Sequence, residues 1–309
     1  MTLPGFSARK NKPVVVVGSL NMDLVMRVPR VPVGGETLNG HEFRTLPGGK
    51  GANQAVACAR LGAQVCMIGQ VGDDGFGHTL RDGLSADGID VSGVALTAGM
   101  DTGVAMILVE DVGQNRIVLA AGANGALSEV DIDAHCAVIQ NAAMLVVQLE
   151  IPMPAVQHAI AIAYAAGVPV LLNPAPAALL PDAIWSQVAI CIPNETEASM
   201  LAGMPVNDTA SAYEAARIFR QRGVACVLVT LGKQGVAIVD DSGERHLPAQ
   251  IVKAVDTTAA GDTFIGGLTA GLAEGLSLDA AVSLGQRASA LCVTRLGAQP
   301  SIPYRWELA

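Results

Sequence analysis

Residues 256–264 read DTTAAGDTF, so two carboxylates, Asp256 and Asp262, stand six positions apart around small residues. The apolar spacing of the segment that follows indicates a helix, whose first turn leaves backbone N–H groups at Ala259, Ala260 and Gly261 without intrahelical partners. Because these three residues lack bulky side chains, a phosphate can approach their amides and the positive end of the helix dipole. The segment therefore predicts an anion-binding site.

Asp262 lies in the first turn of this predicted helix, beside the place that a transferring phosphoryl group would occupy. A carboxylate there can orient a substrate hydroxyl and accept its proton. Many acids in a first turn only complement the helix dipole, and this structural role is an alternative for Asp262. The small residues before it favour the chemical role.

The elements that must position these residues follow a βαβ rhythm. Continuous Val/Ile/Leu runs of strand length are typical of parallel strands that are buried on both faces. With 309 residues, the chain is long enough for one large α/β domain or two smaller ones. The strand-like runs lie at 14–19, 64–71, 144–150, 168–173, 188–194 and 224–232, and helix-like stretches begin at 52, after Pro154 and at about 209.

Two stretches, 23–46 and 102–121, break this rhythm, because strand-like runs meet there at polar turns with no helix between them. We expect them to form antiparallel ribbons added to the main sheet. Polar residues also follow each of four parallel strands, and ligands of open α/β sheets bind beyond the carboxyl ends of the strands. For any single strand, such residues can equally begin a loop. They are Glu150, Asn173, Asn194, Glu195, Thr230 and Gly232.

Composition limits the partners. A net charge of −9 argues against a nucleic acid or an anionic membrane, because both bind clustered Lys and Arg, and it leaves a small molecule. Six cysteines without CxxC spacing predict reduced thiols and no zinc site. No apolar run approaches the length of a membrane span, and no signal core follows the N-terminus, so we expect a cytoplasmic protein.

The two commonest nucleotide motifs are missing. Neither Lys50 nor Lys233 lies in a GxxxxGK[ST] pattern, and the first strand is not followed by GxGxxG. DTTAAGDTFIGGLT instead resembles the C-terminal signature of the ribokinase-like (PfkB) carbohydrate kinase family, and PGGKGANQAVACARLG from Pro47 resembles its N-terminal signature. Further blocks in family order extend the resemblance over about residues 14–304. They are GSLNMD, AGANGALS, QLE, NPAPA, PNETEA, TLGKQG and VTRLGAQPS.

The resemblance implies one α/β domain over residues 1–309, with a doubly wound, mostly parallel, Rossmann-like sheet and a small antiparallel β lid within 23–46 and 102–121. It also implies transfer of the γ-phosphoryl group of ATP to the 5-hydroxyl of D-ribose. The alternatives are a kinase of another sugar or a nucleoside (deoxyribose, fructose or adenosine), and a sugar- or nucleotide-binding regulator without catalysis. Lys50 and the short lid blocks favour ribose over adenosine.

The same resemblance assigns roles to individual residues. Asp262 is the catalytic base, and the backbone of Ala259, Ala260 and Gly261 is the anion hole. Carboxylates and amides accept from and donate to neighbouring hydroxyls, and a lysine adds a donor, which suits a polyol. The sugar ligands implied are Asn21, Asp23, Gly49, Lys50, Asn53, Glu150 and Asp262.

For the nucleotide, the resemblance implies that Asn194 and Glu197 lie near the phosphates and their Mg²⁺, largely through water. The spacing of these two residues also matches an N-cap with its capping-box partner, so a structural role is an alternative. Thr230, Gly232 and Gly261 are expected along the nucleotide. Gln286 is expected near the adenine, where the family often carries His or Asn.

VTRLGAQPS ends a predicted helix, and such a break presents backbone carbonyls that suit a weakly hydrated cation, although it can equally be an ordinary helix terminus. The resemblance implies an activating K⁺ site here. Its members are Asp256, Thr258, Cys292, Arg295, Gly297 and Ser301. The resemblance further implies a homodimer formed through the lid strands, whose exposed edges need cover.

Overall fold

The computed structural model describes residue 9 and residues 12–308. Its main sheet has the order β13-β12-β11-β10-β9-β8-β1-β4-β5, parallel from β11 to β5, with β12 and β13 added antiparallel at one edge. Its strands are β1 (Val14–Val17), β4 (Val65–Gly72), β5 (Asp90–Thr97), β8 (Met144–Val147), β9 (Val170–Leu172), β10 (Ile190–Cys191), β11 (Cys226–Thr230), β12 (Val236–Asp240) and β13 (Gly243–Leu247).

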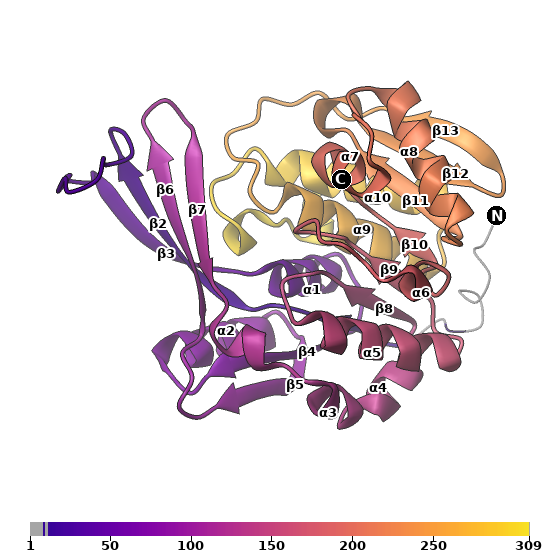
Figure 1. Cartoon of the computed structure of the whole chain (residues 1–309), viewed down its shortest axis with the longest axis horizontal. Helices are drawn as coiled ribbons and strands as arrows, with labels where there is room; N and C mark the ends of the chain where they lie inside the picture. The colour runs from indigo at the N-terminus through magenta and orange to yellow at the C-terminus, as the bar shows by residue number, and fades with distance from the viewer. Residues whose placement is uncertain (1–8, 10–11, 309) are drawn as a thin grey trace.

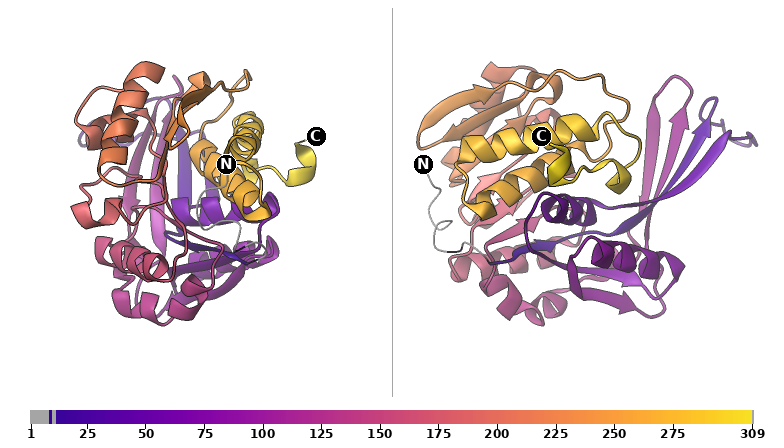
Figure 2. Two further views of the ribbon diagram at one scale, coloured as in Figure 1. Left: turned by 90° about the vertical axis from the view of Figure 1, so that its right-hand side faces the viewer. Right: turned by 180° about the vertical axis from the view of Figure 1, so that it is seen from behind.

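Helices cover both faces of this sheet (Figures 1 and 2). One face carries α3 (Glu129–Asp133), α4 (Cys136–Gln140), α5 (Met153–Ala165), α6 (Asp182–Trp185), α7 (Glu195–Ala202) and α8 (Thr209–Gln221). The other carries α1 (Lys50–Arg60), α2 (Gly75–Ala86), α9 (Ala260–Glu274) and α10 (Leu278–Cys292), of which α1, α9 and α10 stand together in the right panel of Figure 2.

The alternation of side chains along each strand builds the two cores. Val15 and Val17 pack under α3–α8, whereas Val14 and Val16 pack under α1, α9 and α10, and all four are fully buried. Burial on both faces is the reason that these strands are continuously apolar. The predicted doubly wound, mostly parallel sheet is confirmed.

Four further strands form the predicted lid, which stands away from the body in Figure 1. The expectation that these ribbons are added to the main sheet is wrong, because they pair with one another in a separate sheet. They are β2 (Asn21–Val28), β3 (Glu42–Gly48), β6 (Gly103–Glu110) and β7 (Asn115–Ala120), in the order β3-β2-β6-β7. The pairs β2–β3 and β6–β7 are antiparallel hairpins, and β2 joins β6 in parallel. The lid begins only a few residues after β1 ends, so Asp23 on β2 is carried to the edge of the body.

Short 3₁₀ segments complete the described chain: η2 (Gly122–Ala126), η3 (Gly232–Gln234), η4 (Gln299–Ser301) and η5 (Arg305–Glu307). Over residues 9 and 12–308, none of the helices combines the length and the hydropathy of a bilayer-spanning segment.

Candidate active site

The start of α9 has the backbone form expected of an anion site. Ala259, its N-cap, has φ 58°, a left-handed conformation that is uncommon for any residue with a Cβ. The N–H of Ala260 donates to Thr257 O at 3.2 Å, and Ser289 Oγ donates to Ala260 O at 2.9 Å, which ties the turn to α10. A Cβ added to Gly261 would meet no atom within 4 Å. The first turn of α9 therefore faces open space at Gly261.

Asp262 is buried, with 8% of its surface exposed, and both of its carboxylate oxygens accept hydrogen bonds from α1. Asn53 Nδ2 donates to Oδ2 at 3.0 Å, and Gln54 Nε2 donates to Oδ1 at 2.9 Å. Neutral amides hold the carboxylate in place without neutralising it. The remaining lone pairs of both oxygens can accept a hydroxyl proton.

Asp262 is surrounded by four more charged groups, Asp23, Lys50, Glu150 and Glu197. Burial raises the pKa of Asp23 to about 7, and the negative charges of Glu150 and Asp262 add to the effect. Burial by itself lowers the pKa of Lys50, but the charges of Asp262, Glu150 and Glu197 outweigh it and the pKa is raised. Lys50 is thus an ammonium among carboxylates.

Glu150 follows β8 and is held from two sides. Its Oε2 accepts from Ser19 Oγ at 2.5 Å and from the N–H of Lys50 at 3.1 Å. Gly49, just before α1, has φ 89°, and a Cβ there would lie 2.7 Å from the backbone nitrogen of Asn21. Only glycine allows the loop before α1 to lie this close to the start of β2.

Asn21 is anchored by a residue that the sequence analysis did not single out. Asn124, in η2, is 1% exposed; its Oδ1 accepts from Leu20 N–H at 2.9 Å, and its Nδ2 donates to Leu20 O at 2.9 Å and to Asn21 Oδ1 at 2.8 Å. Because Asn21 Oδ1 already accepts this bond, its Nδ2 is the group left for other partners. AGANGALS was recognised as a block, but nothing in it marked Asn124 as the contact.

At the other end of the site, Asn194 and Glu197 form the capping box that their spacing predicts. Asn194 Oδ1 accepts from Glu197 N–H at 2.8 Å, and Glu197 Oε2 accepts from Asn194 N–H at 2.9 Å. Burial raises the pKa of Glu197, against the opposing hydrogen bond from Asn194 and the charge of Lys50. Thr230 forms a β-bridge with Asn194, and Gly232 follows with φ 49°, so these residues lie together.

Gln286 lies on α10. Its Nε2 donates to Leu247 O at 2.9 Å and to Pro248 O at 3.2 Å, so the amide holds the loop after β13.

The segment before the α9 turn meets the loop after α10. Asp256 Oδ1 accepts from the N–H and Oγ1 of Thr258 at 2.9 and 2.7 Å, and Oδ2 accepts from the N–H of Gly297 at 2.9 Å. Burial opposes ionisation of Asp256, but these hydrogen bonds outweigh it, and the pKa is lowered. Cys292 Sγ lies 3.0 Å from Ser301 Oγ and 3.8 Å from Thr258 O. The side chain of Arg295 is paired with Glu307 at 2.6 Å.

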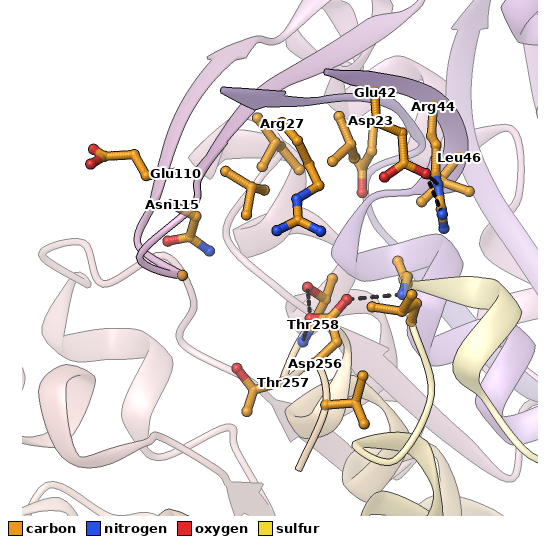
Figure 3. A pocket seen from close by; sticks show the side chains of 18 of the residues that line it. Asp23, Arg27, Glu42, Arg44, Leu46, Glu110, Asn115, Asp256, Thr257 and Thr258 are labelled. Atoms are coloured by element: carbon orange, nitrogen blue, oxygen red, sulfur yellow. Dashed lines mark hydrogen bonds and ion pairs between the residues drawn. The ribbon is translucent and has the colours of Figure 1, made fainter. Parts of the chain in front are cut away.

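A cavity of about 440 Å³ separates the inner face of the lid from the loops of the body (Figure 3). Asp23 and Arg27 reach into it from β2, and Asp256 and Thr258 face them from below. Of the buried carboxylates, the cavity reaches that of Asp23.

A four-stranded lid, and a buried carboxylate in the first turn of a helix that is open at Gly261, define a lidded α/β protein. The chain belongs to the pfkB family of carbohydrate kinases, whose model matches residues 11–305. The resemblance seen in the sequence is confirmed.

Particular relatives cover nearly the whole chain. It is 45% identical over 296 residues to a ribokinase of Haemophilus influenzae, covering 96% of this chain and 97% of the relative. It is 45% identical to a ribokinase of Schizosaccharomyces pombe, with 96% of each covered. Its structure matches that of Arabidopsis thaliana ribokinase complexed with ribose and ATP with a TM-score of 0.90 and 33% identity, over 96% of this chain and 97% of that one.

Proposed function

We propose that this chain transfers the γ-phosphoryl group of ATP to the 5-hydroxyl of D-ribose. The observation that carries the proposal is the geometry of Asp262, a buried carboxylate that accepts only from neutral amides and stands one residue after the open Gly261. The ribokinase names of the similar proteins supply the sugar.

In this proposal, the sugar hydroxyls bind to the polar groups between the lid and α1. Asn21, Asp23, Lys50 and Glu150 supply donors and acceptors, and Gly49 lets the loop approach. Asn53 Oδ1 is buried and has no hydrogen-bond partner within the described residues, and a sugar hydroxyl beside Asp262 would satisfy it.

For the transfer itself, the 5-hydroxyl donates its hydrogen bond to Asp262 and its oxygen attacks the γ-phosphorus. The bond from that phosphorus to the bridging oxygen of ADP breaks, and the proton passes to Asp262. Of the three residues of the anion hole, Ala259 and Gly261 offer their amides to the charge on the transferred group, whereas the N–H of Ala260 already donates to Thr257 O at 3.2 Å. The lid excludes water that would otherwise hydrolyse ATP.

We place the nucleotide along Asn194, Glu197, Thr230 and Gly232, with Gln286 towards the adenine. Mg²⁺ would neutralise phosphate charge when bound. Each carboxylate oxygen of Glu197 accepts one hydrogen bond from Asn194, and the remaining lone pairs can accept from water bound to the ion.

We also propose that K⁺ binds to Asp256, to Ser301 and to the carbonyls of Thr258, Cys292, Arg295 and Gly297; the hydrogen bonds from Thr258 and Gly297 to Asp256 support this. The donor set is made of hard oxygens, which suit this ion. Bound there, it would brace the turn before Ala259 without touching substrate. We expect higher kcat, and a higher unfolding temperature without substrate, in KCl than in choline chloride of equal ionic strength. Equal values in the two salts would return Asp256 to a structural role.

A homodimer through the lid is supported by the outer face of its strands. Met26 pairs in register with Phe43, and Met106 with Val118, and these four side chains are 37%, 57%, 54% and 69% exposed. A second copy would cover them. Light scattering at micromolar concentration should give the mass of a dimer for the unaltered chain and a lower average mass for Met106→Lys. A monomer mass for the unaltered chain contradicts the proposal.

The six cysteines are all free thiols, which supports a reducing compartment such as the cytoplasm.

The proposed function is tested by coupled ADP release with ribose, deoxyribose, fructose and adenosine. We expect the highest kcat/KM with ribose. A clear preference for another substrate moves the assignment to one of the alternative kinases, and ribose binding without ADP release moves it to a regulator.

A further inference from the structure

A chain of buried amide side chains runs from Asp262 into the body behind the site. Gln54, fully buried on α1, donates from Nε2 to Asp262 Oδ1 at 2.9 Å and to Asn173 Oδ1 at 3.1 Å. Gln148, also fully buried, donates from Nε2 to Gln54 Oε1 at 2.6 Å. Asn173 Nδ2 donates to Ile192 O at 2.9 Å. Both hydrogens and the oxygen of the Gln54 amide are therefore engaged.

The direction of this chain follows from the charge of Asp262. An ionised carboxylate only accepts, so Gln54 must turn its NH₂ towards it. The oxygen of Gln54 then faces Gln148, which must present its own NH₂. Gln148 Oε1 is left without a partner within the described residues, 2.1 Å from where a Cβ on Gly18 would lie. The row of amide side chains ends against the backbone of Gly18, and only glycine at this position leaves room for Gln148 Oε1.

We propose that Gln54 is a positioning residue, which fixes the plane of the Asp262 carboxylate in a crowded, negatively charged site. The inference rests on the proposed function. Asn53 holds the other oxygen, so the two amides together determine which lone pairs face the substrate.

The surroundings show why such support is needed. The charged or titratable groups that face Asp262 are Asp23 on β2, Lys50 on α1, Glu150 after β8, Glu197 on α7 and Cys292 on α10. Among them Lys50 is the one cation. Asp23, to whose carboxylate no described residue donates a hydrogen bond, has a pKa raised to about 7 by burial and by its neighbours Glu150 and Asp262. Donors to the ionised form oppose such protonation.

The test uses the full chain with Gln54→Leu and Gln54→Glu. Gln54→Leu removes the donor, and Gln54→Glu keeps the shape and the acceptor for Gln148 but places a second carboxyl against Asp262. We expect kcat to fall about tenfold or more in both, with a smaller change in KM for the sugar, since a misplaced reacting group costs rate. The acidic limb of the kcat–pH profile should move to higher pH in Gln54→Leu, and further in Gln54→Glu, because one variant loses a donor to the carboxylate and the other gains a like charge beside it.

Gln70→Leu is the matched control, because Gln70 is a buried glutamine on β4 outside this chain of amides. It should leave the pH profile unchanged even if it lowers the unfolding temperature. A purely structural role for Gln54 would behave in the same way. A folded Gln54→Glu or Gln54→Leu enzyme with an unshifted acidic limb therefore overturns the proposal.

A second readout does not depend on turnover. The ¹³C resonance of the Asp262 carboxyl, assigned by its loss in Asp262→Asn, should titrate at higher pH in Gln54→Leu than in the unaltered chain. If this shift appears but no sugar is phosphorylated, the positioning of Asp262 stands and the proposed function fails. An identical titration in both chains refutes the positioning role.

Discussion

Replacing Asp262 by asparagine tests whether the carboxylate acts on the substrate or only complements the dipole of α9. The change keeps the shape of the side chain and removes its charge and one acceptor oxygen. As a base that orients the hydroxyl and accepts its proton, Asp262 is worth about 10² to 10⁴ in rate, so kcat of Asp262→Asn should fall by that factor.

The structure also determines the cost to the fold. Asn53 Nδ2 and Gln54 Nε2 donate to the two oxygens at 3.0 and 2.9 Å, but an asparagine offers only one oxygen. Its own NH₂ then faces one of these donors, and one buried hydrogen bond is lost. We expect the free energy of unfolding to fall by about 1–3 kcal/mol, and ribose still to bind.

The assay measures ADP release at saturating ribose and ATP, with ribose binding by calorimetry and unfolding by thermal melting. Asp279→Asn is the matched control, because Asp279 is also a first-turn acid, on α10, outside the site. A dipole role for Asp262 predicts that both variants keep their kcat. If Asp262→Asn retains more than about a tenth of the rate of the unaltered chain, the catalytic role is wrong.

Three further predictions concern neighbouring residues. Gly261→Leu should leave the unfolding temperature unchanged or higher, because leucine favours a helix by up to about 1 kcal/mol over glycine, yet lower kcat more than tenfold by filling the anion site; unimpaired kcat would contradict that site. Asn124→Asp keeps the acceptor for Leu20 N–H but loses the donor to Leu20 O and to Asn21, so KM for ribose should rise about tenfold with less change in kcat, and an unchanged KM would separate Asn124 from sugar binding. Because the pKa of Asp23 is raised from 3.8 to about 7, the folded chain keeps a proton that the unfolded chain releases, and stability should decline between about pH 4 and 7 by on the order of 4 kcal/mol. Urea unfolding of the ligand-free protein against pH should show this decline, and a decline as steep in Asp23→Asn would assign it to other groups.

The sequence by itself determined the architecture, because each relevant signal is local. The run Val14–Val17 is apolar at every position, which is typical of a strand buried on both faces. Small residues before an apolar helix identified the start of α9, and the spacing of Asn194 and Glu197 identified a capping box. Within such segments the interacting groups are a few residues apart, so propensity and periodicity are sufficient.

Tertiary structure alone decided which distant polar groups meet. Gln54 and Asp262 are 208 residues apart, and Leu20 and Asn124 are 104 apart. An amide side chain in an apolar helix indicates that a buried hydrogen-bond partner is needed, but the sequence does not identify that partner. The parallel pairing of β2 with β6 was likewise decided by tertiary structure. Each lid hairpin was visible in the local sequence, but the pairing between the two hairpins depends on where the body places them. Long-range hydrogen bonds and strand pairings depend on how the packed layers bring chain segments together, and periodicity reports only that a residue is buried.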